Sequence, residues 1–318
     1  MISVIIPAYN AEKTIGECLQ ALNSQTFRGE RETIVVDDGS TDGTVVMARK
    51  FGAKVIRQAH AGPAVARNRG AKESRGSIIL FTDSDCVPDA RWLESMVKPF
   101  ADKDVAGVSG TYKTKNADST IARFVGYEIE LRHERMKRFE RIDFVGTYSA
   151  AYRKDVFFKF SGFDTRFETS SAEDSELSFK IANAGNKLVF APDAFVRHRH
   201  PDSVVKYLKQ KFQRGYWRVL LYKMHPEKMK GESYTPPTLL LQTLLTGAAL
   251  ATIPLAYVDY WAVPAVLIGS VLLVNTKFYA FMLRKEISVG LLSIPLTFLR
   301  NLAYGFGVIS GFVKMLLR

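Results

Sequence analysis

Two aspartates separated by one serine follow a short apolar stretch and are the strongest chemical signal in the chain. The stretch is Ile78–Phe81, and Asp83, Ser84 and Asp85 come shortly after it. An apolar run that starts with β-branched residues predicts a buried parallel strand, and ligands of open α/β sheets bind at the carboxyl ends of such strands. Two carboxylates this close repel each other unless a cation intervenes. A divalent ion carrying a diphosphate meets that need; a charged turn before a helix at Asp89 is the alternative.

The segments around these aspartates alternate between strand and helix patterns. The strands are expected at 3–7, 32–36, 54–57, 77–82, 105–112, 144–152 and 188–196. The helices are expected at 11–24, 42–51, 63–74, 92–100 and 172–184, with a charged helix or lid at 120–141. Such alternation predicts an α/β fold with a mostly parallel sheet and right-handed crossovers. The run lacks the glycine-rich turn of dinucleotide-binding folds, which argues against a dehydrogenase.

Composition divides the chain into a soluble part and an apolar tail. The sequence has 318 residues, a formal net charge of +12 and two cysteines, too few for a disulfide framework or a zinc cluster. A strand-like segment at residues 2–6 opens the chain without the features of a signal peptide, so we expect the soluble part to stay in the cytoplasm. The basic excess favours an anionic lipid surface or an anionic substrate. Nucleic acid is disfavoured because the sequence carries no nucleic-acid-binding motif.

The tail contains three apolar segments with the length of membrane helices. Spans are expected near 239–258 and 262–283, with basic residues on both flanks placing those flanks in the cytoplasm. The segment near 289–317 carries Arg300 in its middle, where a charge is costly in a bilayer. It is expected to be either a third span or a re-entrant hairpin with Arg300 at the turn. Buried core helices are the alternative for each segment.

Several short motifs, taken together, resemble the inverting family 2 glycosyltransferases of GT-A fold. They occur in the order typical of that family over residues 1 to about 218. The motifs are Val4-Ile5-Ile6-Pro7-Ala8-Tyr9-Asn10, Val35-Val36-Asp37-Asp38-Gly39-Ser40-Thr41-Asp42-Gly43-Thr44, Ala66-Arg67-Asn68-Arg69-Gly70, Phe81-Thr82-Asp83-Ser84-Asp85, Gly162-Phe163-Asp164, Glu173-Asp174 and His198. The resemblance implies a Rossmann-like GT-A domain at 1–220, followed by a membrane domain at 221–318.

The resemblance also implies which residues bind a nucleotide-sugar donor. The loop after the first strand would pack on the base, with Tyr9 offering an aromatic face or its hydroxyl. Asp38 would accept a hydrogen bond from the base, and Arg67 would meet the base or the phosphates. The full expected donor set is Pro7, Ala8, Tyr9, Asp38, Arg67, Asp83 and Ser84.

A divalent cation is part of the same expectation. In the family pattern Asp85 ligates Mn²⁺ or Mg²⁺ directly, and Asp83 contacts the ribose or completes the shell. His198 matches a family histidine that completes the metal site, although His200 lies close in sequence and is a second candidate. Histidine suits manganese better than magnesium. A basic surface cluster at a strand end is the alternative for these histidines.

The acidic pair Glu173-Asp174 is expected on the acceptor side. By resemblance Asp174 is the general base that removes the acceptor hydroxyl proton, and Glu173 holds the acceptor. Carboxylates in the first turn of a helix are also favoured by the helix dipole, which is the structural alternative.

A basic and aromatic segment lies between the catalytic part and the tail. Arg214, Trp217 and Arg218 could hold a lipid phosphate, or could form only an interfacial belt. The segment is similar to the Q-x-x-R-W element of processive polysaccharide synthases. Because Trp217 precedes Arg218, the order departs from that element and processivity is in doubt.

These observations predict a membrane-anchored, metal-dependent, inverting glycosyltransferase. It would use a nucleotide-diphosphate sugar, with UDP favoured, at the cytoplasmic side of the cell membrane. The expected acceptor is a polyprenyl phosphate or a lipid-linked glycan, and membrane lipids are the other expected partners. A processive polysaccharide synthase, a non-catalytic sugar-nucleotide-binding membrane subunit and a soluble nucleotidyltransferase are the alternatives.

Overall fold

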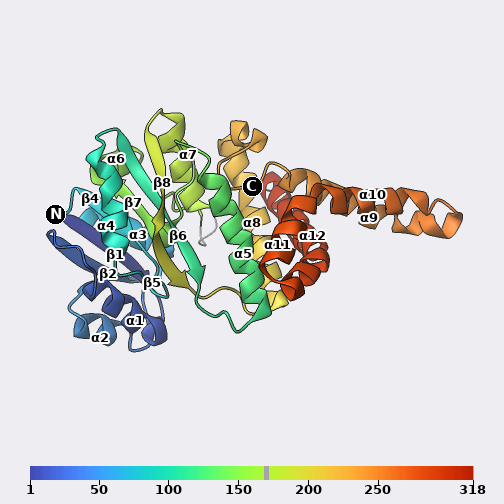
Figure 1. The fold of residues 1–318 in the computed structure, drawn as a ribbon. Helices are drawn as coiled ribbons and strands as arrows, with labels where there is room; N and C mark the ends of the chain where they lie inside the picture. The colour runs from blue at the N-terminus through green and yellow to red at the C-terminus, as the bar shows by residue number, and fades with distance from the viewer. Residues whose placement is uncertain (168–171, 318) are drawn as a thin grey trace. The chain divides into compact units, whose positions relative to one another are not determined.

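The computed structural model describes residues 1–167 and 172–317 of the chain (Figure 1). The chain folds into two compact units. The first contains residues 1–115 and 135–199, and the second contains residues 116–134 and 200–318. Each unit is therefore assembled from two separate segments of the chain. The expected boundary near residue 220, between a catalytic domain and a membrane domain, stays a prediction.

The first unit is built on an eight-stranded mixed sheet with the order β3-β2-β1-β4-β7-β6-β8-β5. The strands are β1 (Ile2–Ala8), β2 (Arg31–Asp37), β3 (Lys54–Arg57), β4 (Ile78–Phe81), β5 (Val87–Pro88), β6 (Val105–Thr114), β7 (Ala150–Arg153) and β8 (Lys187–His198). β1 to β4 pair in parallel, as do β6 and β8, whereas β7 runs antiparallel to both β4 and β6. The expected α/β fold is confirmed, with an antiparallel strand inserted near the middle of the sheet.

Helices cover the sheet of the first unit. They are α1 (Glu12–Asn23), α2 (Thr44–Lys50), α3 (Pro63–Glu73), α4 (Trp92–Val97), α6 (Lys154–Lys159) and α7 (Glu173–Asn183), with 3-10 turns η1 (Lys98–Ala101) and η2 (Thr147–Ser149). The core is closed by alternate strand residues such as Val4 and Ile6, which lie against Ile15 and Leu19 of α1. Burial of these side chains supplies most of the driving force for folding, and it fixes the strand ends that carry the polar loops.

One expected strand is much shorter than the sequence predicts. The segment 144–152 was expected to be extended throughout, but only β7 is a strand, and the turn η2 precedes it. β7 pairs residue by residue with β4, from Phe81 opposite Ala150 to Ile78 opposite Arg153. β7 thus has the same four-residue length as β4, and the residues directly before it form η2.

The second unit is helical in its described residues. Its helices are α5 (Thr120–Met136, whose last two residues belong to the first unit), α8 (Val204–Met224), α9 (Leu239–Thr252), α10 (Ala262–Val274), α11 (Thr276–Lys285) and α12 (Ile287–Leu316), with 3-10 segments η3 (Pro226–Lys230) and η4 (Ile253–Val258). The helix expected at 120–141 thus ends five residues early, at Met136. α9 and α10 lie side by side (Figure 1).

Two helical segments are long and apolar enough to cross a membrane, namely 239–258 and 287–316. The segment expected as a span at 262–283 is a pair of helices, α10 and α11, bent by 56°, which would make a third candidate span if the pair crosses as one. The hairpin considered for 289–317 is wrong, because α12 runs without a break through Arg300. Arg300 needs no turn to reach polar surroundings, since it is buried with Gln242 and Glu128 as hydrogen-bonding partners.

Candidate functional site

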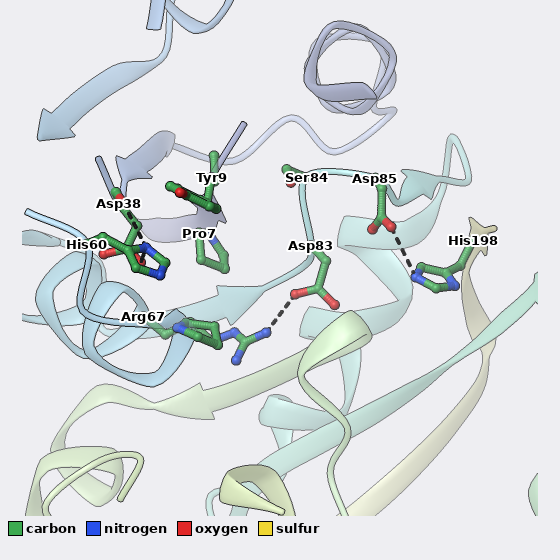
Figure 2. A pocket seen from close by; sticks show the side chains of 11 residues that line it. Pro7, Tyr9, Asp38, His60, Arg67, Asp83, Ser84, Asp85 and His198 are labelled. Atoms are coloured by element: carbon green, nitrogen blue, oxygen red, sulfur yellow. Dashed lines mark hydrogen bonds and ion pairs between the residues drawn. The ribbon is translucent and has the colours of Figure 1, made fainter. Parts of the chain in front are cut away.

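A cavity of about 330 Å³ opens where several strands of the first unit end (Figure 2), a size typical of small-molecule sites. Its walls come from the ends of β1, β2, β4 and β8 and from the start of α3. The lining residues are Pro7, Ala8, Tyr9, Asp38, His60, Pro63, Arg67, Asp83, Ser84, Asp85 and His198. All the residues expected at the donor or the metal therefore line a single cavity.

The turn after β4 separates the two aspartates. The backbone N–H of Cys86 donates to the carbonyl of Asp83 at 3.0 Å, which closes a tight turn. The hydroxyl of Thr82 donates to the carbonyl of Tyr148 at 2.9 Å and anchors the start of this turn. Asp83 consequently points toward Arg67, whereas Asp85 points toward His198 (Figure 2).

Asp85 and His198 form the group best suited to hold a divalent ion. Asp85 Oδ2 lies 3.3 Å from His198 Nε2, and a ligand atom of Cys86 lies within 4.8 Å of both. Burial, followed by the charges of Asp83 and Asp85, raises the pKa of the Cys86 thiol well above its usual value. The carboxylate of Asp85 and the imidazole of His198 are donors suited to a divalent ion.

The structure places His198, and not its neighbour, in the cavity. Burial by itself lowers the pKa of His198, but the hydrogen bond and charge of Asp85 raise it above the usual value. His200 is buried elsewhere, and its backbone N–H and carbonyl pair with the side chain of Asn116. Proximity to Asp85 thus favours His198 of the two expected candidates.

Arg67 connects the two acidic parts of the site. It lies on α3, is 1% exposed, and bonds to Asp83 Oδ1 at 2.7 Å and to Glu173 Oε1 at 2.9 Å. Burial lowers the pKa of Arg67, while Asp83, Glu173 and then Asp174 raise it above its usual value. α3 can approach β1 this closely because residue 70 is glycine. A Cβ at Gly70 would lie only 2.4 Å from the side chain of Ile5. The guanidinium expected at the nucleotide is engaged by two carboxylates.

The acidic pair lies in the first turn of α7. Glu173 is 1% exposed and uses one oxygen for Arg67 and the other for the N–H of Ala172. Asp174 is half-buried and accepts the N–H of Ser175 at 2.7 Å. Glu173 is thereby held in place by buried polar contacts, and the more exposed Asp174 has greater access to a second substrate.

The other end of the cavity is organised by Asp38. Its carboxylate accepts the backbone N–H groups of Ala61 at 3.0 Å and Gly62 at 2.9 Å, and lies 2.9 Å from His60 Nδ1. The His60 ring stacks on Tyr9, with centroids 4.2 Å apart. Together they form an aromatic surface at the cavity wall (Figure 2). The sequence analysis missed His60, whose only signal was its place between a strand and the proline that begins α3.

The basic and aromatic residues expected near the acceptor lie on α8, in the second unit. Arg218 bonds to Glu232 at 2.9 Å and to the hydroxyl of Thr235 at 2.8 Å. Trp217 packs edge-on against Tyr216. Arg214 is half-buried on the same helix. A role for Arg214, Trp217 and Arg218 in acceptor or phosphate binding stays a prediction.

Comparisons with known proteins agree with this fold. Residues 3–159 match the family model described as Glycosyl transferase family 2. Glycosyltransferase AglE of Haloferax volcanii is 31% identical over 62% of this chain and 66% of its own length. A β-1,3-glucosyltransferase of Escherichia coli, WfgD, whose name gives UDP-Glc as donor and α-D-GlcNAc-diphosphoundecaprenol as acceptor, is 33% identical over 39% of this chain and 51% of its own length.

A solved structure extends the similarity of fold to almost the whole chain. The mannosyltransferase PcManGT from Pyrobaculum calidifontis, in complex with GDP-Man and Mn²⁺, superposes with a TM-score of 0.63 at 21% identity. The similarity covers 98% of this chain and 87% of that protein. The matches to AglE and WfgD span only about half to two thirds of those proteins. The solved structure shows a shared fold, and the matching family model together with the homologous glycosyltransferases shows that the chain belongs to glycosyltransferase family 2.

Proposed function

We propose that this glycosyltransferase moves a hexose from a nucleotide-diphosphate donor, with UDP favoured as the nucleotide, to a lipid-linked acceptor, with inversion at the anomeric carbon. The observation that carries the proposal is one cavity with an aromatic surface at one end and the Asp85–His198 pair at the other. A nucleotide-diphosphate sugar has a flat base at one end and an anionic diphosphate near the other. The cavity therefore matches the donor in the order of its parts.

The nucleoside end of the donor is assigned to Tyr9 and Asp38. Tyr9 is half exposed, so its ring is free to stack on a base, as aromatic rings do on flat π-systems. The Asp38 carboxylate holds the 58–62 loop and defines how far the base enters. Asp83 and Ser84 are placed to contact the ribose.

The diphosphate end is assigned to Asp85 and His198, which would hold a divalent ion. When bound, such an ion offsets the charge that develops on the departing nucleoside diphosphate. The carboxylate and imidazole donor set, together with the Mn²⁺ in the related mannosyltransferase structure, favours manganese over magnesium.

Asp174 is assigned as the general base. It takes the proton of the acceptor hydroxyl while the acceptor oxygen bonds to C1 of the sugar. The bond between C1 and the phosphate oxygen breaks in the same step, and the nucleoside diphosphate leaves from the opposite face. Glu173 and Arg67 hold Asp174 in place through the buried contacts at the start of α7.

A polyprenyl phosphate or a lipid-linked glycan is the proposed acceptor. The name of WfgD specifies a diphosphoundecaprenol-linked glycan, and 239–258 and 287–316 are apolar enough to cross a membrane. The net charge of +12 favours binding to anionic lipids. We accordingly assign 1–220 to catalysis and 221–318 to membrane anchoring at the cytoplasmic side of the cell membrane.

The purified, detergent-solubilised protein tests this proposal with a panel of nucleotide sugars. The reaction is run with Mn²⁺ or Mg²⁺, with and without polyprenyl phosphate, and with chelator. Chelator-sensitive transfer from one donor to the lipid is the expected result. Transfer to a glycan but not to polyprenyl phosphate would identify a glycan as the acceptor. Repeated addition of sugars would favour a processive synthase. Donor binding without turnover under every condition would favour a non-catalytic subunit.

A further inference from the structure

The longest helix of the second unit, α12, has the composition of a membrane span but not its surroundings. Its 30 residues extend for about 45 Å at 1.5 Å per residue, well beyond a hydrocarbon core of about 30 Å. We infer that α12 lies in the plane of the membrane surface, with one face in lipid, instead of crossing the bilayer. The inference rests on the membrane association in the proposed function, and it assigns the inserted part of the chain to α9 and α10.

A strongly basic helix lies against the carboxyl-terminal half of α12. A Cβ added at Gly307 would lie 2.1 Å from the carbonyl oxygen of Phe212, and one at Gly311 would lie 2.4 Å from that of Tyr216. The backbones of α8 and α12 are therefore in direct contact, and the two helices run in the same direction. The basic residues of α8 are Lys206, Lys209, Lys211, Arg214, Arg218 and Lys223. A crossing α12 would draw these charges into hydrocarbon, where each is costly.

The middle of α12 contacts a second charged helix. Arg300 is 6% exposed and lies 3.3 Å from Glu128 of α5, while its other nitrogen donates to Gln242 at 2.7 Å. Glu128 also pairs with Lys211 at 2.6 Å and with Arg132 at 3.3 Å. These charges compensate one another within the unit, which is how buried ionic groups are tolerated. Arg300 therefore has polar partners on both α5 and α9. The ion pairs of Glu128 with Arg300 and Lys211 hold α5 and α8 against α12.

The same pattern continues at the amino-terminal end of α12. Glu286 directly precedes the helix and bonds to Arg123 of α5 at 2.9 Å. Charged partners thus meet α12 at its start and middle, and the basic helix α8 lies against its carboxyl-terminal half. No stretch long enough to span the hydrocarbon lies between them in the described residues of α12, whereas an in-plane helix keeps all of them at the membrane surface.

The opposite face of α12 is apolar and exposed. Most of its side chains are three, four or seven residues apart, which places them on one side of the helix. They are Ile287, Leu291, Ile294, Leu299, Phe306, Ile309, Val313 and Leu316, from 36% to 71% exposed. One apolar face and one polar face are typical of helices that lie at a membrane interface.

Lipid is the occupant that fits this apolar face. The neighbouring segment in the chain, α9 with η4 and α10, is itself apolar and carries the exposed aromatic residues Tyr257, Tyr260 and Trp261 where η4 leads into α10. Tyrosine and tryptophan are enriched where membrane proteins meet the interface. A second copy of the chain is the competing occupant, and the test below distinguishes it.

Single cysteines carrying a spin label measure the depth of each position in vesicles that contain anionic lipid. The labels replace Leu291, Leu299, Phe306 and Val313 of the full-length chain. Cys18 and Cys86 are buried, and an otherwise identical sample without an added cysteine corrects for any label on them. Relative collision rates with oxygen and with a water-soluble nickel complex give the depth.

The expected result is a shallow depth that is the same within about 5 Å at all four positions, with oxygen collisions favoured over nickel. Leu291 and Val313 lie about 33 Å apart along the helix, so a crossing α12 would place Leu299 and Phe306 about 10 Å deeper than the two ends. That profile would overturn the inference. Preferential nickel collisions, or broadening by a neighbouring label from a second copy, would overturn it as well.

Labels at Leu244 and Leu250 of α9 provide the matched control. Both side chains are exposed, and they lie about 9 Å apart along a helix assigned to the bilayer, so their depths should differ. Equal shallow depths at these two positions would contradict insertion of α9. Because all depths are measured without donor or acceptor, failure of sugar transfer would refute the proposed function without changing this result.

Discussion

Replacing Arg67 by methionine removes a buried cation while keeping most of the side-chain volume. Glu173 is 1% exposed and would be left as an uncompensated buried carboxylate, a loss of about 3–5 kcal/mol in the free energy of unfolding. The Asp83 side chain is 29% exposed, so water replaces much of its interaction, and its contribution is about 1 kcal/mol or less. At about 2–4 °C per kcal/mol for a domain of this size, the melting temperature should fall by about 6–20 °C.

Thermal unfolding of the full-length protein in detergent measures this loss, with two further variants. Arg69→Met lies on the same helix at an exposed position, and should melt close to the wild type. The double variant Arg67→Met with Glu173→Gln has no buried carboxylate without a partner at residue 173. Its free energy of unfolding should be about 1–3 kcal/mol higher than the sum of the two single effects would give. If Arg67→Met melts within about 2 °C of the wild type, or if the two substitutions are additive, the bridging role of Arg67 is refuted.

Four further predictions concern the candidate site. Asp85→Ala should lower metal-dependent donor binding and transfer by at least about 100-fold, measured by titration with Mn²⁺; an unchanged metal requirement would count against the site. Asp174→Asn should bind donor normally but transfer about 10²–10⁴ times more slowly, and near-normal turnover would exclude it as the base. His60→Ala should weaken donor binding about 2- to 10-fold through loss of the Tyr9 stack, with equal affinity contradicting an aromatic surface for the base. Without metal, the pKa of His198 is higher in the folded protein than its unfolded value near 6.5. The pairing of His198 with Asp85 therefore stabilises the fold fully below the unfolded pKa, and this stabilisation is lost as the pH rises through the folded pKa. The difference in melting temperature between wild type and His198→Gln should therefore shrink on raising the pH, and a growing difference would contradict this sign.

Local patterns were sufficient for the elements and their polar ends. Apolar runs predicted the strands β1, β2 and β4. The acidic residues Asp38, Asp83 and Asp85 follow such runs, and a buried strand reaches the surface where its sequence becomes polar. The same reasoning failed for 144–152, where 147–149 form η2 and only 150–153 pair with β4 and β6. Pairing between distant strands is not encoded in the pattern of either strand alone.

Motifs and apolar patterns were enough to predict the fold class, the family and most residues that surround the cavity. How these residues combine became visible in the folded chain. It paired Asp85 with His198 across the ends of β4 and β8, linked Arg67 to both Asp83 and Glu173 at the cavity, and added His60 to the cavity wall. Arg300 finds its partner inside an unbroken helix, whereas the sequence was compatible with either a span or a turn at this residue. The physical reason is the same in each case: the cost of a buried charge depends on which distant side chain reaches it, and that is settled by packing.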